Sequence, residues 1–161
     1  MNKKYIHSIS IIIPIFNEAN NIFFLLDEIY HHLNKLIDFE VILINDSSTD
    51  SFLEVFNKKK YSNVFLINNK INLGQSKSLQ LGILKSNFDN IVTLDGDGQN
   101  NPKDIIKLLN IYFEKNYNLV SGIRIKRKDS FIKKISSKIA NKIRSIILKD
   151  KCPDTGCSLK I

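Results

Sequence analysis

The chain has 161 residues, of which 43% are hydrophobic and 25% are charged, a globular composition that excludes a disordered or collagen-like protein. Its length predicts a single domain over residues 1–161, and two cysteines without a signal-peptide pattern favour a reduced, cytoplasmic protein. The apolar run over residues 9–16 is too short to cross a bilayer, so we expect no transmembrane segment.

Apolar runs and amphipathic stretches alternate along the chain. The runs predict strands over residues 9–15, 40–44, 64–67, 90–94 and 118–121. Helical spacing of apolar residues predicts helices over about 22–36, 51–58, 75–85 and 102–112. Strands separated by helices predict an α/β fold, in which helices sandwich a mostly parallel central sheet.

The net charge of +8 is concentrated in one segment. Residues 124–151 hold eleven lysines and arginines against two aspartates, so this segment carries +9 and the rest of the chain −1. A near-neutral body joined to one basic segment indicates two surfaces or two partners.

Polar clusters follow three of the predicted strands, at residues 14–18, 45–48 and 95–99. In an open parallel sheet, ligands bind beyond the carboxyl ends of the strands. These clusters therefore predict one shared pocket at that edge of the sheet.

The pair Asp95 and Asp97 is the most informative of these features. Two carboxylates two residues apart in a turn can hold one hard cation, and Mg²⁺ typically takes one or two carboxylates plus substrate phosphates. Gly96 allows a tight turn, and Gln99 adds a neutral oxygen. An acidic glycine turn is also common as a plain loop, but its place after a buried strand favours a binding role.

The remaining candidates allow two interpretations each. Asp46 presents acceptors to a base or ribose, or else caps the next helix, a role that Ser48, Thr49 or Asp50 could equally fill. Glu18 is either a ligand-facing residue or a first-turn helix residue favoured by the helix dipole. Residues 72–76 either contact a phosphate through backbone amides or cap a helix.

The basic segment also has an apolar stripe. Isoleucines recur every three or four residues, at positions 132, 135, 139, 143, 146 and 147. This pattern is typical of a helix on a membrane surface, and equally of a helix that packs on the sheet with a solvated basic face. Nucleic-acid binding is disfavoured, because Phe131 alone offers an aromatic ring for stacking.

Six stretches resemble the family 2 glycosyltransferases, and within them the polyprenyl-phosphate sugar transferases similar to dolichol-phosphate mannose synthase. They follow the family's order over nearly the whole chain: SIIIPIFNEANNI, VILINDSSTDS, NLGQSKSLQLGI, IVTLDGDGQNNP, LVSGIRIKR and PDTGCSLK. Asn45 and Ser47 stand where the family more often has Asp and Gly. The resemblance implies a GT-A-type nucleotide-sugar-binding domain.

The resemblance also implies roles for individual residues. The nucleoside pocket would be lined by Pro14, Phe16, Glu18 and Asp46. A divalent cation, Mg²⁺ or Mn²⁺, would be held on the diphosphate at the turn containing Gly96, by Asp95, Asp97 and Gln99. The acceptor phosphate would lie near Arg124, with further contacts from Lys133, Lys134 and Ser137. Asp97 and Arg124 would be the catalytic residues.

Together these features predict a metal-dependent, inverting glycosyltransferase that moves a hexose from a nucleoside-diphosphate sugar to a polyprenyl phosphate. We expect residues 8–123 to bind the nucleotide and residues 124–151 to face the acceptor and the cytoplasmic side of the membrane, peripherally. Two alternatives stay open, a saccharide-hydroxyl acceptor and an inactive nucleotide-sugar-binding module. Family domains usually continue past the DTGCSLK-like strand, so the resemblance implies a C-terminally truncated domain.

Overall fold

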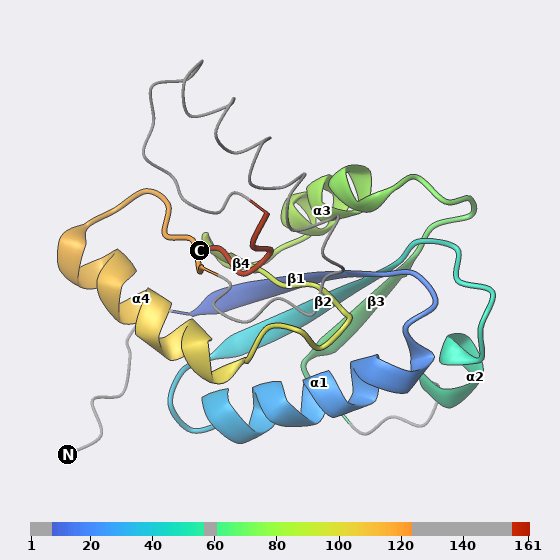
Figure 1. Ribbon diagram of the computed structural model, residues 1–161, viewed down its shortest axis with the longest axis horizontal. Coiled ribbons are helices and arrows are strands. Elements are labelled where there is room, and N and C mark those ends of the chain that lie inside the picture. The colour runs from blue at the N-terminus through green and yellow to red at the C-terminus, as the bar shows by residue number, and fades with distance from the viewer. Residues whose placement is uncertain (1–7, 57–60, 124–155) are drawn as a thin grey trace, which may run out of the picture.

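Four parallel strands form the central sheet of the computed structural model, which describes residues 8–56, 61–123 and 156–161 (Figure 1). The strands are β1 (Ile9–Ile15), β2 (Phe39–Asn45), β3 (Val64–Asn68) and β4 (Asn90–Thr93), in the order β3-β2-β1-β4. The helices are α1 (Ala19–Leu33), α2 (Phe52–Phe56), α3 (Gln75–Leu84) and α4 (Lys103–Lys115). The predicted α/β architecture is confirmed.

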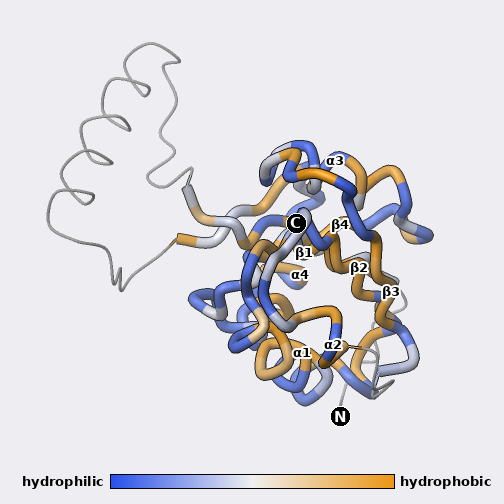
Figure 2. Tube along the Cα trace, turned by 90° about the vertical axis from the view of Figure 1, so that its right-hand side faces the viewer, coloured by the Kyte–Doolittle hydropathy of each residue, from blue (hydrophilic) through white to orange (hydrophobic). Residues whose placement is uncertain are grey.

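Strands β1 and β2 lie at the centre of the sheet. All seven residues of β2 are buried, as are six of the seven in β1, because helices cover both faces. The register pairs Ile9 with Phe39 and Ile15 with Asn45, so the two strands end level with one another. Figure 2 shows the hydrophobic residues gathered in the strands and the hydrophilic residues more often in the loops.

Helices pack on both faces of the sheet (Figure 1). Successive side chains of a strand point to opposite faces, so alternate residues of β1 belong to different clusters. Ile11 and Ile13 pack in the core beneath α1, α2 and α4, whereas Ile12 packs on the side of α3. At Gly82 in α3, a β-carbon would lie 2.7 Å from Ile44 Cδ1, so this glycine lets the helix approach the sheet closely.

The predicted fifth parallel strand over residues 118–121 was wrong. Only Ser121 forms a bridge, and its partner is Lys160 in antiparallel orientation. Lys160 also bridges to Thr93 of β4, whose backbone N–H donates to the Lys160 carbonyl oxygen at 2.9 Å. The last residues of the chain therefore lie between β4 and residues 120–122, a long-range pairing that the local apolar run does not reveal.

Two other expectations concern membranes. Within the described ranges, the helices are too short or too polar to cross a bilayer. The basic segment with its predicted membrane contact, residues 124–151, lies outside the described residues. The predicted helical residues 57 and 58 also lie outside them.

Candidate active site

A cavity of about 260 Å³ opens at the carboxyl end of the sheet. Its walls come from the end of β1, from the loops that follow β1, β2 and β4, and from the first residue of α3. The lining residues are Pro14, Ile15, Phe16, Glu18, Asp46, Gln75, Asp95, Gly96 and Asp97. The structure thus brings together seven of the predicted site residues, from three segments of the chain that span Pro14 to Asp97.

The turn after β4 holds two carboxylates at this cavity. Asp95 and Asp97 are both partly buried, and Gly96 between them is buried. A β-carbon on Gly96 would lie 2.7 Å from Ile15 Cγ2 and 3.4 Å from the Pro14 carbonyl oxygen. A side chain at this position would therefore push the acidic turn away from β1.

The donor set at this turn fits Mg²⁺ or Mn²⁺. Hard divalent cations of this kind are bound through one or two carboxylates, with substrate phosphates and water as the other ligands. Asp95 and Asp97 supply two carboxylates, and in the part of the chain described by the structure no three His, Cys, Asp or Glu side chains are grouped so that they could hold a metal ion together. The site suits an ion that arrives with a phosphate group better than one held by protein alone.

Asp46 lies at the back of the cavity and is 4% exposed. Its Oδ1 accepts hydrogen bonds from Asn69 Nδ2 (2.7 Å) and Leu73 N (2.9 Å), and its Oδ2 accepts one from Gly74 N (2.8 Å). Burial alone would raise the pKa of the Asp46 carboxyl, but these bonds and one with Ser78 outweigh burial and hold the pKa below its ordinary value. Asp46 is therefore a charged carboxylate that fixes the loop between β3 and α3, and not a cap of α2.

The loop after β1 contributes an aromatic ring and a fourth carboxylate. Phe16 is 47% exposed, which leaves part of its ring available for contact with a flat ligand. Glu18 occupies the N-cap position of α1, but its carboxylate accepts a hydrogen bond from Asn21 Nδ2 (2.7 Å) and not from the helix backbone. This position is compatible both with a ligand-facing role of Glu18 and with a role at the start of the helix.

A small polar network joins the loops after β1 and β2. Asn17 Oδ1 accepts a hydrogen bond from Thr49 N (2.7 Å), and Asp50 Oδ2 accepts one from Ala19 N (2.8 Å) at the start of α1. Asp50 Oδ1 also accepts one from Phe52 N (3.2 Å), the first residue of α2. Asp50 therefore has the helix-capping role that the sequence allowed, and it links two walls of the cavity.

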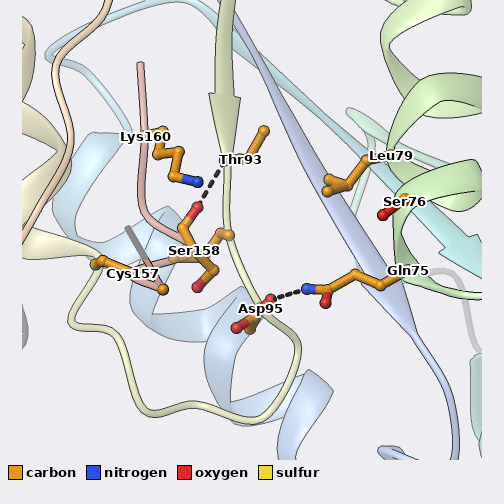
Figure 3. Close-up of a pocket in the computed structure, with 10 residues that line it drawn as sticks. Gln75, Ser76, Leu79, Thr93, Asp95, Cys157, Ser158 and Lys160 are labelled. Atoms are coloured by element: carbon orange, nitrogen blue, oxygen red, sulfur yellow. Dashed lines mark hydrogen bonds between the residues drawn. The ribbon is translucent and has the colours of Figure 1, made fainter. Parts of the chain in front are cut away.

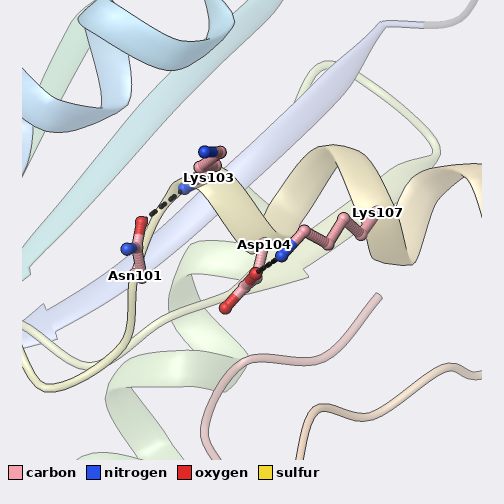
Figure 4. Close-up of polar contacts among 4 residues, drawn as sticks. All are labelled: Asn101, Lys103, Asp104 and Lys107. Atoms are coloured by element: carbon pink, nitrogen blue, oxygen red, sulfur yellow. Dashed lines mark hydrogen bonds and ion pairs between the residues drawn. The ribbon is translucent and has the colours of Figure 1, made fainter.

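Gln99 is not among the residues that line this cavity. It lines a separate cavity of about 630 Å³ beside α4, although its backbone N–H donates to Asp97 Oδ1 at 3.0 Å. Polar groups at the start of α4 pair with one another: Lys107 Nζ lies 2.6 Å from Asp104 Oδ1, and Lys103 N donates to Asn101 Oδ1 (Figure 4). The residues predicted to contact the acceptor phosphate, Arg124, Lys133, Lys134 and Ser137, lie outside the described residues.

Ile15 and Gln75 line the cavity but were not among the predicted site residues, and Gln75 is the polar one of the two. It lines the cavity together with Asp95, and both also line a neighbouring polar cavity of about 230 Å³ near Ser158 and Lys160 (Figure 3). The stretch over residues 72–76 pointed to this loop, but it suggested backbone contacts and gave no signal for the glutamine side chain.

A parallel α/β sheet with an acidic turn and an exposed aromatic ring at its carboxyl edge has the features of a nucleotide-binding domain. The glycosyl transferase family 2 pattern matches residues 10–160, and the chain belongs to this family.

Two similar relatives are polyprenyl-phosphate sugar transferases by name. Dodecaprenyl-phosphate galacturonate synthase of Rhizobium johnstonii is 35% identical over 95% of this chain and 47% of that protein. Undecaprenyl-phosphate 4-deoxy-4-formamido-L-arabinose transferase of Photorhabdus laumondii is 31% identical over 99% of this chain and 50% of that protein. The chain spans about half the length of these curated relatives.

Solved structures with the same fold confirm the GT-A-type architecture. Glucosyl-3-phosphoglycerate synthase from Mycobacterium tuberculosis, in complex with Mn²⁺, UDP and glucosyl-3-phosphoglycerate, has a TM-score of 0.71 and 16% identity, over 96% of this chain and 56% of that one. A mannosyltransferase from Pyrobaculum calidifontis, in complex with GDP-Man and Mn²⁺, has a TM-score of 0.64 and 21% identity, over 74% of this chain and 35% of that one.

Proposed function

We propose that the chain forms the donor-binding part of a divalent-cation-dependent, inverting glycosyltransferase that transfers a hexose to a polyprenyl phosphate. The observation that carries this proposal is the cavity in which Phe16, Asp46, Asp95 and Asp97 meet. The names of the relatives above 30% identity support the acceptor class, and the Mn²⁺ and nucleotides bound by structures of the same fold support the donor and the ion.

In the proposed complex, the nucleoside lies between the loops after β1 and β2. Pro14, Phe16 and Glu18 form one side of this space and Asp46 the other. The diphosphate lies toward Asp95 and Asp97, whose carboxylates hold Mg²⁺ or Mn²⁺, and Gln99 stays a predicted further ligand. A bound divalent cation supplies positive charge that stabilises the departing diphosphate.

The reaction is a single displacement at the anomeric carbon. An oxygen of the acceptor phosphate forms the new bond as the bond to the diphosphate oxygen breaks, so the configuration inverts. A phosphate monoester has a second pKa near 6 and is largely dianionic at neutral pH, so it requires orientation more than deprotonation. Such an acceptor therefore requires no general base in the proposed mechanism.

The acceptor side of the proposal rests on the sequence of residues 124–151. Its net charge of +9 favours contact with an anionic membrane surface and with a phosphate group. Arg124, Lys133, Lys134 and Ser137 are the proposed phosphate contacts, with Arg124 beside the reacting atoms. The proposed location is therefore peripheral, at the cytoplasmic face of the membrane.

The proposal is tested by transfer of radiolabelled sugar from a panel of UDP- and GDP-sugars into polyprenyl phosphate, with Mg²⁺ or Mn²⁺. Asp97→Ala removes a carboxylate from the proposed ion site, and we expect the rate to fall about a hundredfold or more. Asp104→Ala is the matched control, because Asp104 lies on α4 and pairs with Lys107 at the surface.

Three results would contradict the proposal. Unchanged transfer by Asp97→Ala would remove the role of the ion. Transfer to a saccharide hydroxyl, without any requirement for polyprenyl phosphate, would replace the acceptor class. Thermal stabilisation by nucleoside diphosphates without turnover of any donor would leave a nucleotide-binding module.

A further inference from the structure

We propose that Gln75 is a positioning residue that fixes the carboxylate of Asp95 for cation binding. Gln75 Nε2 donates a hydrogen bond to Asp95 Oδ1 at 2.6 Å, a contact between two residues 20 positions apart (Figure 3). The proposal rests on the proposed function, because it assigns Gln75 a role only if Asp95 holds a cation.

The backbone just before Gln75 is held in place by the conformation of Gly74 and by its hydrogen bonds. Gly74 has φ +82°, a left-handed conformation that glycine adopts readily and other residues rarely adopt. The Gly74 N–H donates to the buried Asp46 carboxylate at 2.8 Å, and the Gly74 carbonyl accepts from Ser78 N at 3.1 Å. Helix α3 therefore starts at a point fixed on both sides, and its first side chain projects toward the turn after β4.

These contacts form a continuous link between two carboxylates on different strands. It runs from Asp46 after β2, through Gly74 N and the Gln75 side chain, to Asp95 after β4. The loop between β3 and α3 thus fixes the distance between the nucleoside side of the cavity and the cation side. A carboxylate held in place before binding loses less conformational freedom when it takes up an ion.

An amide suits this role better than a charged donor. A hydrogen bond to a charged group is stronger than one between neutral groups, so the neutral Gln75 amide can orient Asp95 effectively. The amide adds no positive charge beside the proposed cation, whereas a lysine at this position would repel it. The Gln75 contact therefore orients Asp95 without adding a charge that competes with the ion.

The test measures Mn²⁺ binding to the 161-residue chain in the presence of UDP or GDP, by titration calorimetry. Gln75→Leu keeps a similar volume and removes the donor, and we expect Mn²⁺ affinity to fall about fivefold. Gln80→Leu is the matched control, because Gln80 is an exposed glutamine on the same helix that accepts a hydrogen bond from Lys77 Nζ. The thermal midpoint without ligand should stay the same in both variants.

A double-mutant comparison separates positioning from a general structural effect. In an Asp95→Asn background, Gln75→Leu should weaken Mn²⁺ binding by less than about twofold, because the group through which it acts has lost its charge. Equal Mn²⁺ affinity in the wild type and Gln75→Leu would overturn this inference while the proposed function stands. A wild-type chain that binds neither nucleotide with Mn²⁺ would overturn both.

Discussion

The two ends of β2 each carry a buried carboxylate, and the two groups differ in what surrounds them. Glu40 and Asp46 are both 4% exposed. Glu40 lies near the start of the strand, where its oxygens accept hydrogen bonds from Ser10 Oγ (2.6 Å), Asn87 N (2.7 Å) and Asn87 Nδ2 (2.7 Å). Asp46 follows the end of the strand and holds the loop between β3 and α3.

The comparison shows that burial and hydrogen bonding do not by themselves mark a functional carboxylate. Both groups secure a loop against the sheet, Glu40 the loop before β4 and Asp46 the loop before α3. Asp46 in addition borders a cavity that contains Asp95 and Asp97, because the carboxyl ends of the parallel strands meet there. Position along the strand thus separates a structural carboxylate from a candidate ligand-binding one.

The largest loss of stability is expected from Glu40→Ala. The substitution leaves the Ser10 hydroxyl and two N–H donors of Asn87 without their acceptor, and we expect a loss of about 3 kcal/mol in the free energy of unfolding. Urea denaturation checks this value, with Glu28→Ala on the surface of α1 as a near-neutral control. UDP or GDP binding by the folded fraction of Glu40→Ala should not change. If Glu40→Ala kept the stability of the wild type but lost nucleotide binding, the structural role of Glu40 would be contradicted.

Asp46→Asn is expected to affect both stability and binding. At pH 7 it replaces a charged acceptor with an amide that faces N–H donors, at a cost of about 2 kcal/mol. The folded-state pKa of Asp46 lies below its ordinary value, so its stabilisation is complete above the unfolded-state pKa and is lost as pH falls through the folded-state pKa.

The pH dependence provides the measurement for Asp46. Urea unfolding of the wild type and Asp46→Asn should differ most between pH 5 and pH 7, and the difference should shrink as pH falls from about 4 through the lower folded-state pKa, where the native carboxyl becomes protonated. A constant difference down to pH 2 would show that the Asp46 charge contributes nothing to stability. Asp38→Asn, at an exposed loop position, is the control.

The smallest change in stability is expected from Ser47→Gly, next to Asp46. Ser47 has φ +64°, a conformation that costs an ordinary residue roughly 1–2 kcal/mol. Glycine relieves this strain but loses more chain entropy on folding, so we expect a net gain of about 0.5 kcal/mol. Ser76→Gly within α3 should instead destabilise the chain by about 0.5 kcal/mol, and equal effects of the two substitutions would contradict the role of backbone strain.

Much of the fold follows from short-range patterns. The continuous apolar run of β1 and the spacing of Ile22, Leu25 and Ile29 define a buried strand and an amphipathic helix without reference to the rest of the chain. The pairing of Ser121 with Lys160 was missed, because it joins segments 39 residues apart and the apolar run over residues 118–121 does not show which segment it pairs with.

The candidate site likewise has features that follow from local sequence patterns and others that depend on long-range contacts. The Asp95-Gly96-Asp97 turn is visible in the sequence, because it combines two acidic residues with a glycine directly after an apolar run. The contact of Gln75 with Asp95 is not visible, since a glutamine at the start of a helix is ordinary until the helix is placed beside β4.

The alternation of strands and helices, the family and the acidic turn can be recognised from the chain's order of residues, because each depends on residues that are neighbours in the chain. The tertiary structure alone decided that Asp46 anchors the loop before α3, that Gly74 directs Gln75 to Asp95, and that Glu40 has a structural role. The physical reason is that hydrogen-bond geometry depends on distances of a few tenths of an ångström between segments whose relative position is set only when the sheet and its helices pack together.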